Sequence, residues 1–372
     1  MLRDNRFDYT LFAVVLILLT VGVVMIYSAS AYMAQVKLNQ SEHFFKKQLL
    51  WFVLSVSLIL LISRINYHHW RKLAWPIIIM SFILLAAVFT QREINGSRRW
   101  LFLMGNSLQP SEVFKYALVM FTAMFLSRNE NMVNSLREMI WPWGACVALG
   151  LGMILMQPDL GMVLVIMMTM FIVLYMAGLK YRYIFASSLI PVVLVAVMVV
   201  GFNYKPHRLV SFVEPQNTEQ NDSYQVNQSL LAIGSGGLFG KGVGRGSAKM
   251  LHLPESHTDF IIANLAEEGG FFFVAICLGL YFTVVMRGLK IASLAPDKFG
   301  FYLAFGIVAI LAINIIINIG VATRLLPTTG MTLPFLSYGG SSVLCSSLGV
   351  GILLNISRHR LKVSKLFEKK RS

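Results

Sequence analysis

The sequence predicts an all-α integral membrane protein with about ten transmembrane helices and a large extracytoplasmic loop between helices 7 and 8. Three observations carry this prediction. The 372 residues are 56% hydrophobic and only 13% charged, which is far too apolar for a soluble domain. Apolar windows of transmembrane length recur along the chain, and basic residues gather in short clusters between alternate windows. We expect a single polytopic membrane domain over residues 1–372.

Each apolar window is close to the length that crosses about 30 Å of hydrocarbon as a helix. The windows are 11–31, 46–63, 73–90, 111–127, 140–157, 160–179, 183–202, 259–286, 300–322 and 333–356. The first window is long for the apolar part of a cleaved signal peptide, and further spans follow, so we expect a retained helix. Pro110 suits the first turn of the fourth helix. Only Gln157-Pro158-Asp159 separates the fifth from the sixth, and the eighth opens with the polar stretch 259–268.

The basic clusters predict the orientation of the helices. An even number of spans places both termini on one side, and the positive-inside rule assigns the side richer in Lys and Arg to the cytoplasm. This side contains the amino terminus, the basic tail 357–372 and alternate loops such as the one with Arg71 and Lys72. The segment 203–258 is then the large outer loop, part of which we expect to dock at the membrane surface as short amphipathic pieces.

Composition also excludes several classes of function. The net charge is +15, but the basic residues form no continuous face, so we expect no nucleic-acid partner. The three cysteines lie in separate apolar stretches and the histidines match no metal motif, which excludes a disulfide framework and a zinc site. The glycine-rich run 233–246 is not a Walker A loop, because Gly242 stands where Ser or Thr is needed. Either its NH groups approach an anion together with Lys241, or the run is a hinge.

Charged groups placed at membrane depth are costly and point to function. Glu112 and Lys115 share one helix face, and they form either a structural ion pair or a substrate contact. Asp159 either caps the sixth helix or belongs to a site. Lys47 lies where the second helix enters from the outer side, and it either snorkels to the interface or holds a pyrophosphate.

The end of the large loop carries the sharpest pattern. Thr258 or Asp259 could be the ordinary cap of the eighth helix. An acid at the boundary between water and membrane is also where a general base would act on a lipid-tethered substrate. The residue pattern alone does not decide between these two interpretations.

Five motifs, in this order and over nearly the whole chain, resemble the FtsW, RodA and SpoVE family. They are Gln109-Pro110-Ser111-Glu112 with Lys115, Gln157-Pro158-Asp159-Leu160-Gly161, Gly236-Gly237-Leu238-Phe239-Gly240, Pro254-Glu255-Ser256-His257-Thr258-Asp259-Phe260 and Leu333-Pro334-Phe335-Leu336-Ser337-Tyr338-Gly339-Gly340-Ser341-Ser342. The ten-helix topology expected from hydropathy agrees with the fold of that family.

The resemblance implies a peptidoglycan glycosyltransferase that polymerises lipid II at the outer face of the bacterial cytoplasmic membrane and releases polyprenyl diphosphate. Asp259 matches the essential acid of the family. Glu112 and Lys115 match its intramembrane ion pair, and Lys47 matches a basic position near the lipid pyrophosphate. The other positions that the resemblance suggests for substrate binding or its support are Arg98, Arg99, Gln109, Ser111, Asp159, Gln225, Gln228, Lys241, His257, Thr258, Ser337 and Tyr338.

The resemblance also implies partners and a branch of the family. The expected partners are a class B penicillin-binding transpeptidase, division or elongation proteins, the growing glycan chain and membrane lipids. A divalent cation such as Mg²⁺ or Mn²⁺ could assist near the diphosphates. Tyr224-Gln225 resembles the division and sporulation branch, whereas Thr329 stands where many division proteins have Lys. A lipid II flippase and a non-catalytic scaffold for the transpeptidase are the alternatives.

Overall fold

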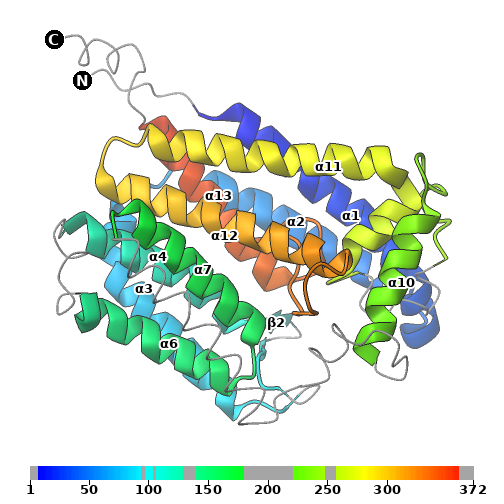
Figure 1. Cartoon of the computed structure of the whole chain (residues 1–372), viewed down its shortest axis with the longest axis horizontal. Coiled ribbons are helices and arrows are strands. Elements are labelled where there is room, and N and C mark those ends of the chain that lie inside the picture. The colour runs from blue at the N-terminus through cyan, green and yellow to red at the C-terminus, as the bar shows by residue number, and fades with distance from the viewer. Residues whose placement is uncertain are drawn as a thin grey trace.

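The computed structural model describes residues 7–93, 97–103, 106–128, 139–179, 221–247 and 257–359, and these form a helical bundle (Figure 1). The α-helices are α1 (Tyr9–Leu38), α2 (His43–Ile62), α3 (His68–Ala87), α4 (Pro110–Arg128), α6 (Ala145–Met156), α7 (Leu160–Met176), α10 (Asn221–Ser235), α11 (Ile261–Ser293), α12 (Lys298–Ala322) and α13 (Gly340–Arg358). Shorter elements are η1 (Val88–Thr90), η3 (Met139–Gly144), β1 (Leu101–Leu103) and β2 (Asn106–Leu108).

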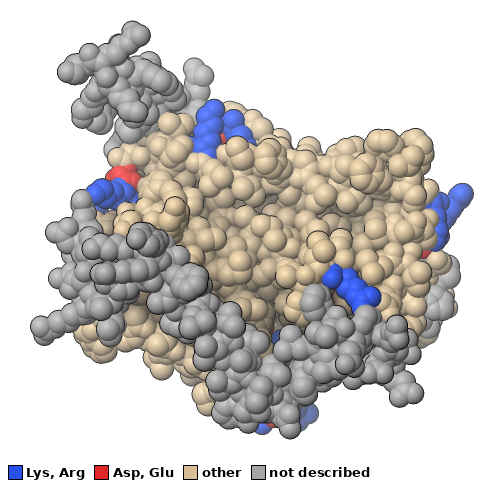
Figure 2. All heavy atoms as spheres, in the orientation of Figure 1, with Lys and Arg blue, Asp and Glu red and all other residues tan. Residues whose placement is uncertain are grey.

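Six of the described helices are long and apolar enough to cross a membrane, namely α1, α2, α3 with η1, α11, α12 and α13. The helices α6 and α7 are apolar but shorter. Most of the described surface in Figure 2 is uncharged, as expected for a surface that faces lipid. The chain is therefore a multi-pass helical membrane protein. The predicted window 183–202 lies outside the described residues.

Two local departures from the predicted elements have clear causes. The last window was predicted from residue 333, but α13 begins at Gly340, because Pro334 and the positive φ of Phe335 (68°) interrupt the helical path. Residues 101–103 and 106–108 form an antiparallel hairpin that pairs Leu101 with Leu108 and Leu103 with Asn106. Strands of three residues are too short to give a detectable alternation in the sequence.

The centre of the bundle is formed by α4, α12 and α13. In α12 and α13, 72% and 83% of the most apolar window is buried, against 22% in α2 and α11. Small residues allow close packing there: a Cβ atom added at Gly349 would lie 2.9 Å from the side chains of both Ile307 and Tyr116. Since lipid is as apolar as the helices, such close contacts are a main source of attraction between them.

One end of the bundle joins the first and last described helices, and we call it the terminal end. The buried carboxylate of Asp8 caps α1 and accepts hydrogen bonds from Arg287 of α11, with the shorter N–O distance at 2.6 Å. The amide of Asp8 donates to Ser357 Oγ of α13 (3.3 Å). These contacts tie α1, α11 and α13 together.

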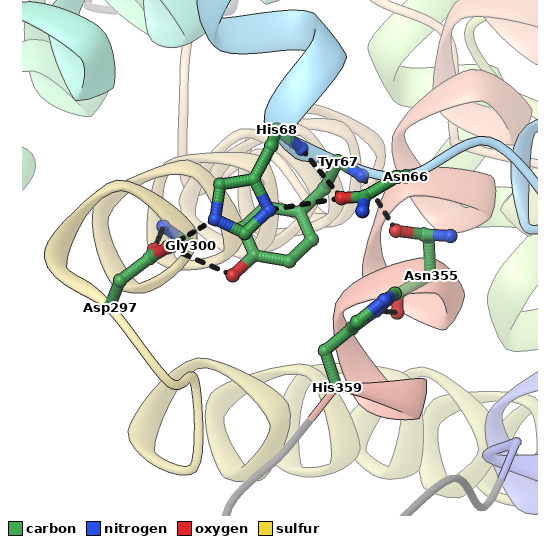
Figure 3. A network of polar contacts seen from close by, with 7 residues as sticks. All are labelled: Asn66, Tyr67, His68, Asp297, Gly300, Asn355 and His359. Atoms are coloured by element: carbon green, nitrogen blue, oxygen red, sulfur yellow. Dashed lines mark hydrogen bonds and ion pairs between the residues drawn. The ribbon is translucent and has the colours of Figure 1, made fainter. Parts of the chain in front are cut away.

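A second polar network holds two turns at the same end (Figure 3). The amide of Tyr67 donates to Asn355 Oδ1 of α13 (2.8 Å), and the Asn355 side chain donates to the Ser63 carbonyl (2.9 Å). Asp297, which caps α12, accepts from the Tyr67 hydroxyl (2.9 Å) and lies 2.8 Å from His68 Nε2. The α2–α3 and α11–α12 turns are thereby fixed beside the end of α13. We call the opposite end the site end.

Replacing Asp8 by Ala should lower the free energy of unfolding by roughly 2 kcal/mol, because α1 loses its cap and Arg287 loses its partner. Thermal or denaturant unfolding in detergent measures this loss. The matched control is Glu42→Ala, which removes an exposed pair with Lys46 and should change stability by less than about 0.5 kcal/mol. Equal effects of the two changes would contradict the assigned role of the terminal end.

Candidate functional site

Asp259 lies at the site end, directly before α11, and is partly exposed. The N-cap of α11 is Phe260, whose side chain makes no capping hydrogen bond. The structure thus places the cap of α11 at Phe260 rather than at Thr258 or Asp259. The cap lies one residue later because helical geometry starts at Ile261.

Three consecutive backbone carbonyls fix the chain at Asp259. The His257 carbonyl accepts from the Tyr338 amide (2.9 Å), and the Thr258 carbonyl accepts from the Ser337 hydroxyl (2.6 Å). The Asp259 carbonyl accepts from Asn318 Nδ2 of α12 (2.9 Å). Ser337 and Tyr338 are thus brought to Asp259 as supports of the backbone, which the sequence motif alone did not reveal.

Aromatic rings join this segment to the start of α2. The Phe44 ring lies 5.1 Å from the His257 ring and 5.3 Å from the Tyr338 ring, measured between centroids. The His257 and Tyr338 rings lie 5.8 Å apart. Burial raises the pKa of the Tyr338 phenol, so its hydroxyl stays protonated at neutral pH.

Lys47 shares the face of α2 that carries Phe44, because residues three apart lie on one side of a helix. Trp51, one turn further, packs against Gly340, where an added Cβ atom would overlap the indole ring. Lys47 is partly buried and makes no hydrogen bond or ion pair within the described residues. Its neighbour Lys46 is highly exposed and pairs with Glu42 at 2.9 Å. Lys47 is thus a cation placed beside the aromatic cluster without a carboxylate partner there.

The segment before α13 borders the other side of Asp259. A Cβ atom added at Gly330 would lie 3.7 Å from Asp259 Oδ2. Asn318 Nδ2 also donates to the Met331 carbonyl (2.6 Å), which fixes this segment to α12. A Cβ atom at Gly161 would lie 3.0 Å from the Thr329 carbonyl, so the start of α7 packs here as well. The second motif therefore packs against the segment that borders Asp259.

Asp159 caps α7, as one of its two interpretations predicted: its Oδ1 accepts from the Met162 amide (3.3 Å). It also accepts from Gln109 Nε2 (3.0 Å) and lies 3.6 Å from the Arg99 guanidinium. Arg99 further donates to the carbonyls of Gln157 and Pro158. These bonds organise the turn between α6 and α7. Arg98, by contrast, is exposed and pairs with Glu93 at 3.0 Å.

The predicted ion pair between Glu112 and Lys115 is present on α4, with 2.9 Å between the charged atoms. Both side chains are almost fully buried, and Ser111 beside them is completely buried, with no hydrogen bond for its hydroxyl within the described residues. The pair lies in the most buried part of the bundle, where an uncompensated charge would be costly.

The glycine-rich run approaches an anion that belongs to the protein itself. Lys241 Nζ lies 2.7 Å from Glu267 Oε1, and the amide of Gly244 donates to Glu268 Oε2 (3.1 Å). Sequence reasoning did not assign these two acids a role in the site. The available signal was a pair of adjacent acids within an apolar helix, which is costly unless both are bonded.

Gln225 and Gln228 lie on α10. The side-chain amide of neither residue makes a hydrogen bond within the described residues. The helix is held at the end of α12, where Ser229 Oγ donates to the Ala322 carbonyl (2.8 Å). It lies in the segment where the sequence predicts short amphipathic pieces. The described residues contain no group of three His, Cys, Asp or Glu that could hold a metal ion.

Comparison with known proteins assigns the chain to a family. Residues 9–362 match the FtsW/RodA/SpoVE family, described as a cell cycle protein. The chain is 39% identical over 358 residues to the probable peptidoglycan glycosyltransferase FtsW of Trichlorobacter lovleyi, covering 95% of this chain and 94% of the relative. It is 39% identical over 355 residues to stage V sporulation protein E of Bacillus subtilis, covering 95% and 97%.

Solved structures agree with this assignment. A chain from work on the "structural coordination of polymerization and crosslinking by a peptidoglycan synthase complex" matches with a TM-score of 0.77 and 27% identity, covering 96% of this chain and 99% of that one. The rod shape determining protein RodA of Thermus thermophilus matches with a TM-score of 0.70 and 28% identity, covering 96% and 98%. Fold and site define a multi-pass helical membrane protein with an acid at one rim. The chain belongs to the FtsW/RodA/SpoVE family.

Replacing Glu112 by Ala should lower the free energy of unfolding by roughly 3–5 kcal/mol, because Lys115 is left charged and unpaired in the core. The double variant Glu112→Gln with Lys115→Met removes both charges and should recover most of this loss. Thermal unfolding in detergent compares the two. A single variant as stable as the wild type would show that the pair contributes nothing to the fold.

Proposed function

We propose that this protein is a peptidoglycan glycosyltransferase that polymerises lipid II into glycan strands at the outer face of the cytoplasmic membrane. Polyprenyl diphosphate is the leaving group, and the process served is division or a related septal event. The observation that carries the proposal is Asp259, partly exposed and fixed through its own carbonyl at the rim of the bundle. The names of the curated relatives support the reaction class.

In the proposed mechanism, Asp259 is the general base. The hydroxyl of the acceptor sugar attacks the anomeric carbon of the donor chain, and Asp259 takes its proton. A glycosidic C–O bond forms as the bond between the anomeric carbon and the diphosphate oxygen breaks, with the electron pair leaving on the diphosphate. The proton then passes from Asp259 to solvent. A positioned base of this kind contributes about 10² to 10⁴ in rate.

Lys47 is the group that we assign to the diphosphate. Of the four basic candidates, Arg99 is engaged with the α6–α7 turn, Arg98 with Glu93 and Lys241 with Glu267. Lys47 alone among them is without such a partner in the described residues, and a fixed cation stabilises charge that develops on a leaving phosphate.

The remaining candidates support these two groups. Ser337 and Tyr338, with His257 and Thr258, hold the backbone at Asp259, and Gln109, Asp159 and Arg99 hold the neighbouring turn. Glu112 and Lys115 form an ion pair in the core, and Ser111 lies beside them. Gln225 and Gln228 lie on α10, within the large loop, and we assign to them contacts with the glycan.

We assign the terminal end to the cytoplasm and the site end to the outer side of the inner membrane. Both chain termini and the basic tail 357–372 then lie in the cytoplasm, and the loop 203–258 lies outside, within one polytopic domain of residues 1–372. Basic residues at the terminal end support this orientation, since Arg287 and Arg358 both lie beside α1 there. Because one structural neighbour comes from a complex that polymerises and crosslinks, we expect a class B penicillin-binding transpeptidase as partner.

Asp259→Asn should abolish glycan synthesis, with a loss of at least about 10²-fold, since the amide cannot accept the proton. Purified full-length protein with its partner transpeptidase is given labelled lipid II, and the products are sized on a gel. Wild-type protein that moves lipid II across vesicles but makes no polymer would favour a flippase. Wild-type protein that only binds the partner would favour a scaffold.

Lys47→Met should lower kcat/KM for lipid II polymerisation at least about tenfold, mainly through kcat, because the leaving diphosphate loses a fixed cation. The matched control is the neighbouring change Lys46→Met, which removes an exposed lysine and should leave kcat/KM within about twofold. Initial rates of polymer synthesis over a range of lipid II concentrations measure both. Equal effects of the two changes would exclude a specific role for Lys47.

A further inference from the structure

The helix that follows Asp259 is broken one-third of the way along. Gly270 has φ 72° and ψ −176°, so α11 consists of a first segment, Ile261–Gly269, and a longer second segment from Phe271. We call the first segment the half-helix. The break frees the amides of Phe271 and Phe272 from helical bonding, and they donate to the carbonyls of Gly237 (2.9 Å) and Leu238 (3.2 Å).

Residues 236–247, which we call the glycine loop, fill the break closely. The loop amides of Lys241 and Gly242 donate to the carbonyls of Glu267 and Glu268, each at 3.0 Å. A Cβ atom at Gly240, where φ is +78°, would clash with the Glu268 carbonyl, so the backbone there requires glycine. The glycine loop is therefore bonded through its main chain to both segments of α11: its amides donate to the half-helix, and its carbonyls accept from the second segment.

Two completely buried carboxylates add side-chain bonds to the same contact. Glu267 Oε1 accepts from Lys241 Nζ (2.7 Å) and from both the amide and the hydroxyl of Ser247 (2.8 Å each). Glu268 accepts from Ser28 Oγ of α1 (2.6 Å to the nearer oxygen) and from the Gly244 amide (3.1 Å). The half-helix is thereby held to α1 as well as to the glycine loop.

We infer that the glycine loop, Glu267 and Glu268 form a clamp that fixes the direction of the half-helix, and that Lys241, Glu267 and Glu268 are positioning residues for Asp259. This inference rests on the proposed function. At about 1.5 Å of rise per residue, Asp259 lies roughly 16 Å from Gly270. A tilt of about 5° around that break would move the carboxylate by about 1.4 Å, and a misplacement of about 1 Å can cost 10²-fold in rate.

The clamp predicts changes in kcat and KM that differ from those expected for a residue that binds substrate. Lys241→Gln should lower kcat for lipid II polymerisation about 10- to 100-fold and leave KM within about threefold, because the substrate still binds while the base is misplaced. Lys241→Arg keeps a cation for Glu267 and should retain activity within about threefold. The matched control on the same loop is Arg245→Gln, which removes an exposed charge and should leave both constants unchanged.

Glu267→Gln and the double variant Glu267→Gln with Lys241→Gln complete a mutant cycle. If the two residues act through each other, the double variant should be no slower than the worse single variant. A raised KM with unchanged kcat in Lys241→Gln, or multiplied losses in the double variant, would overturn the clamp and indicate direct contact of Lys241 with substrate. An equal loss in Arg245→Gln would also overturn it, since loop charge in general would then be responsible.

The variant Ser247→Ala keeps the proposal testable if the other variants do not fold. It removes one hydroxyl from Glu267 while the Ser247 amide still donates, so the bundle should form and kcat should fall about threefold. An unchanged kcat in Ser247→Ala and in folded Lys241→Gln would refute the positioning role. Wild-type protein that makes no polymer would instead refute the proposed function, so the two failures are distinguishable.

Discussion

The hydrogen bond from Asn318 to the carbonyl of Asp259 links the site to a helix at the buried centre of the bundle. Asn318 is buried on α12, a helix packed on most of its faces, and it divides its amide group between Asp259 and Met331. The carboxylate therefore takes its position from a core helix although it stands at the end of a long loop. A site supported in this way is more precise than one carried by the loop alone.

Buried or partly buried charge recurs among the described residues, and in four places an acid and a base are paired. Asp8 meets Arg287 at the terminal end, and Glu112 meets Lys115 in the core. Asp159 meets Arg99 at the α6–α7 turn, and Glu267 meets Lys241 near the site end. Such pairs add little net stability compared with apolar residues of similar volume. Three of the four join different elements, so each of these three favours one arrangement of the segments that it connects.

Hydropathy predicted the bundle and most of its helices, because the need to satisfy backbone groups in lipid leaves few other solutions. The pairing of Glu112 with Lys115 and the capping by Asp159 also followed from local spacing. Contacts between distant segments did not. The sequence motif contained Ser337 without indicating that its hydroxyl supports the Thr258 carbonyl, and it placed Lys241 near an unspecified anion rather than beside Glu267. The break in α11 lies within one predicted apolar window, and the available signal was the pair Gly269-Gly270, since adjacent glycines mark turns.

The terminal end has a consequence for how the protein is made. The amide of Asp8 and the hydroxyl of Ser357 are separated by 349 positions in the chain. At about 5–20 residues per second, the ribosome needs roughly 17–70 s to deliver the second partner after the first. Since α11 is synthesised before α13, Asp8 can meet Arg287 before it meets Ser357. The contact that joins α1 to α13 forms only after α13 has been synthesised.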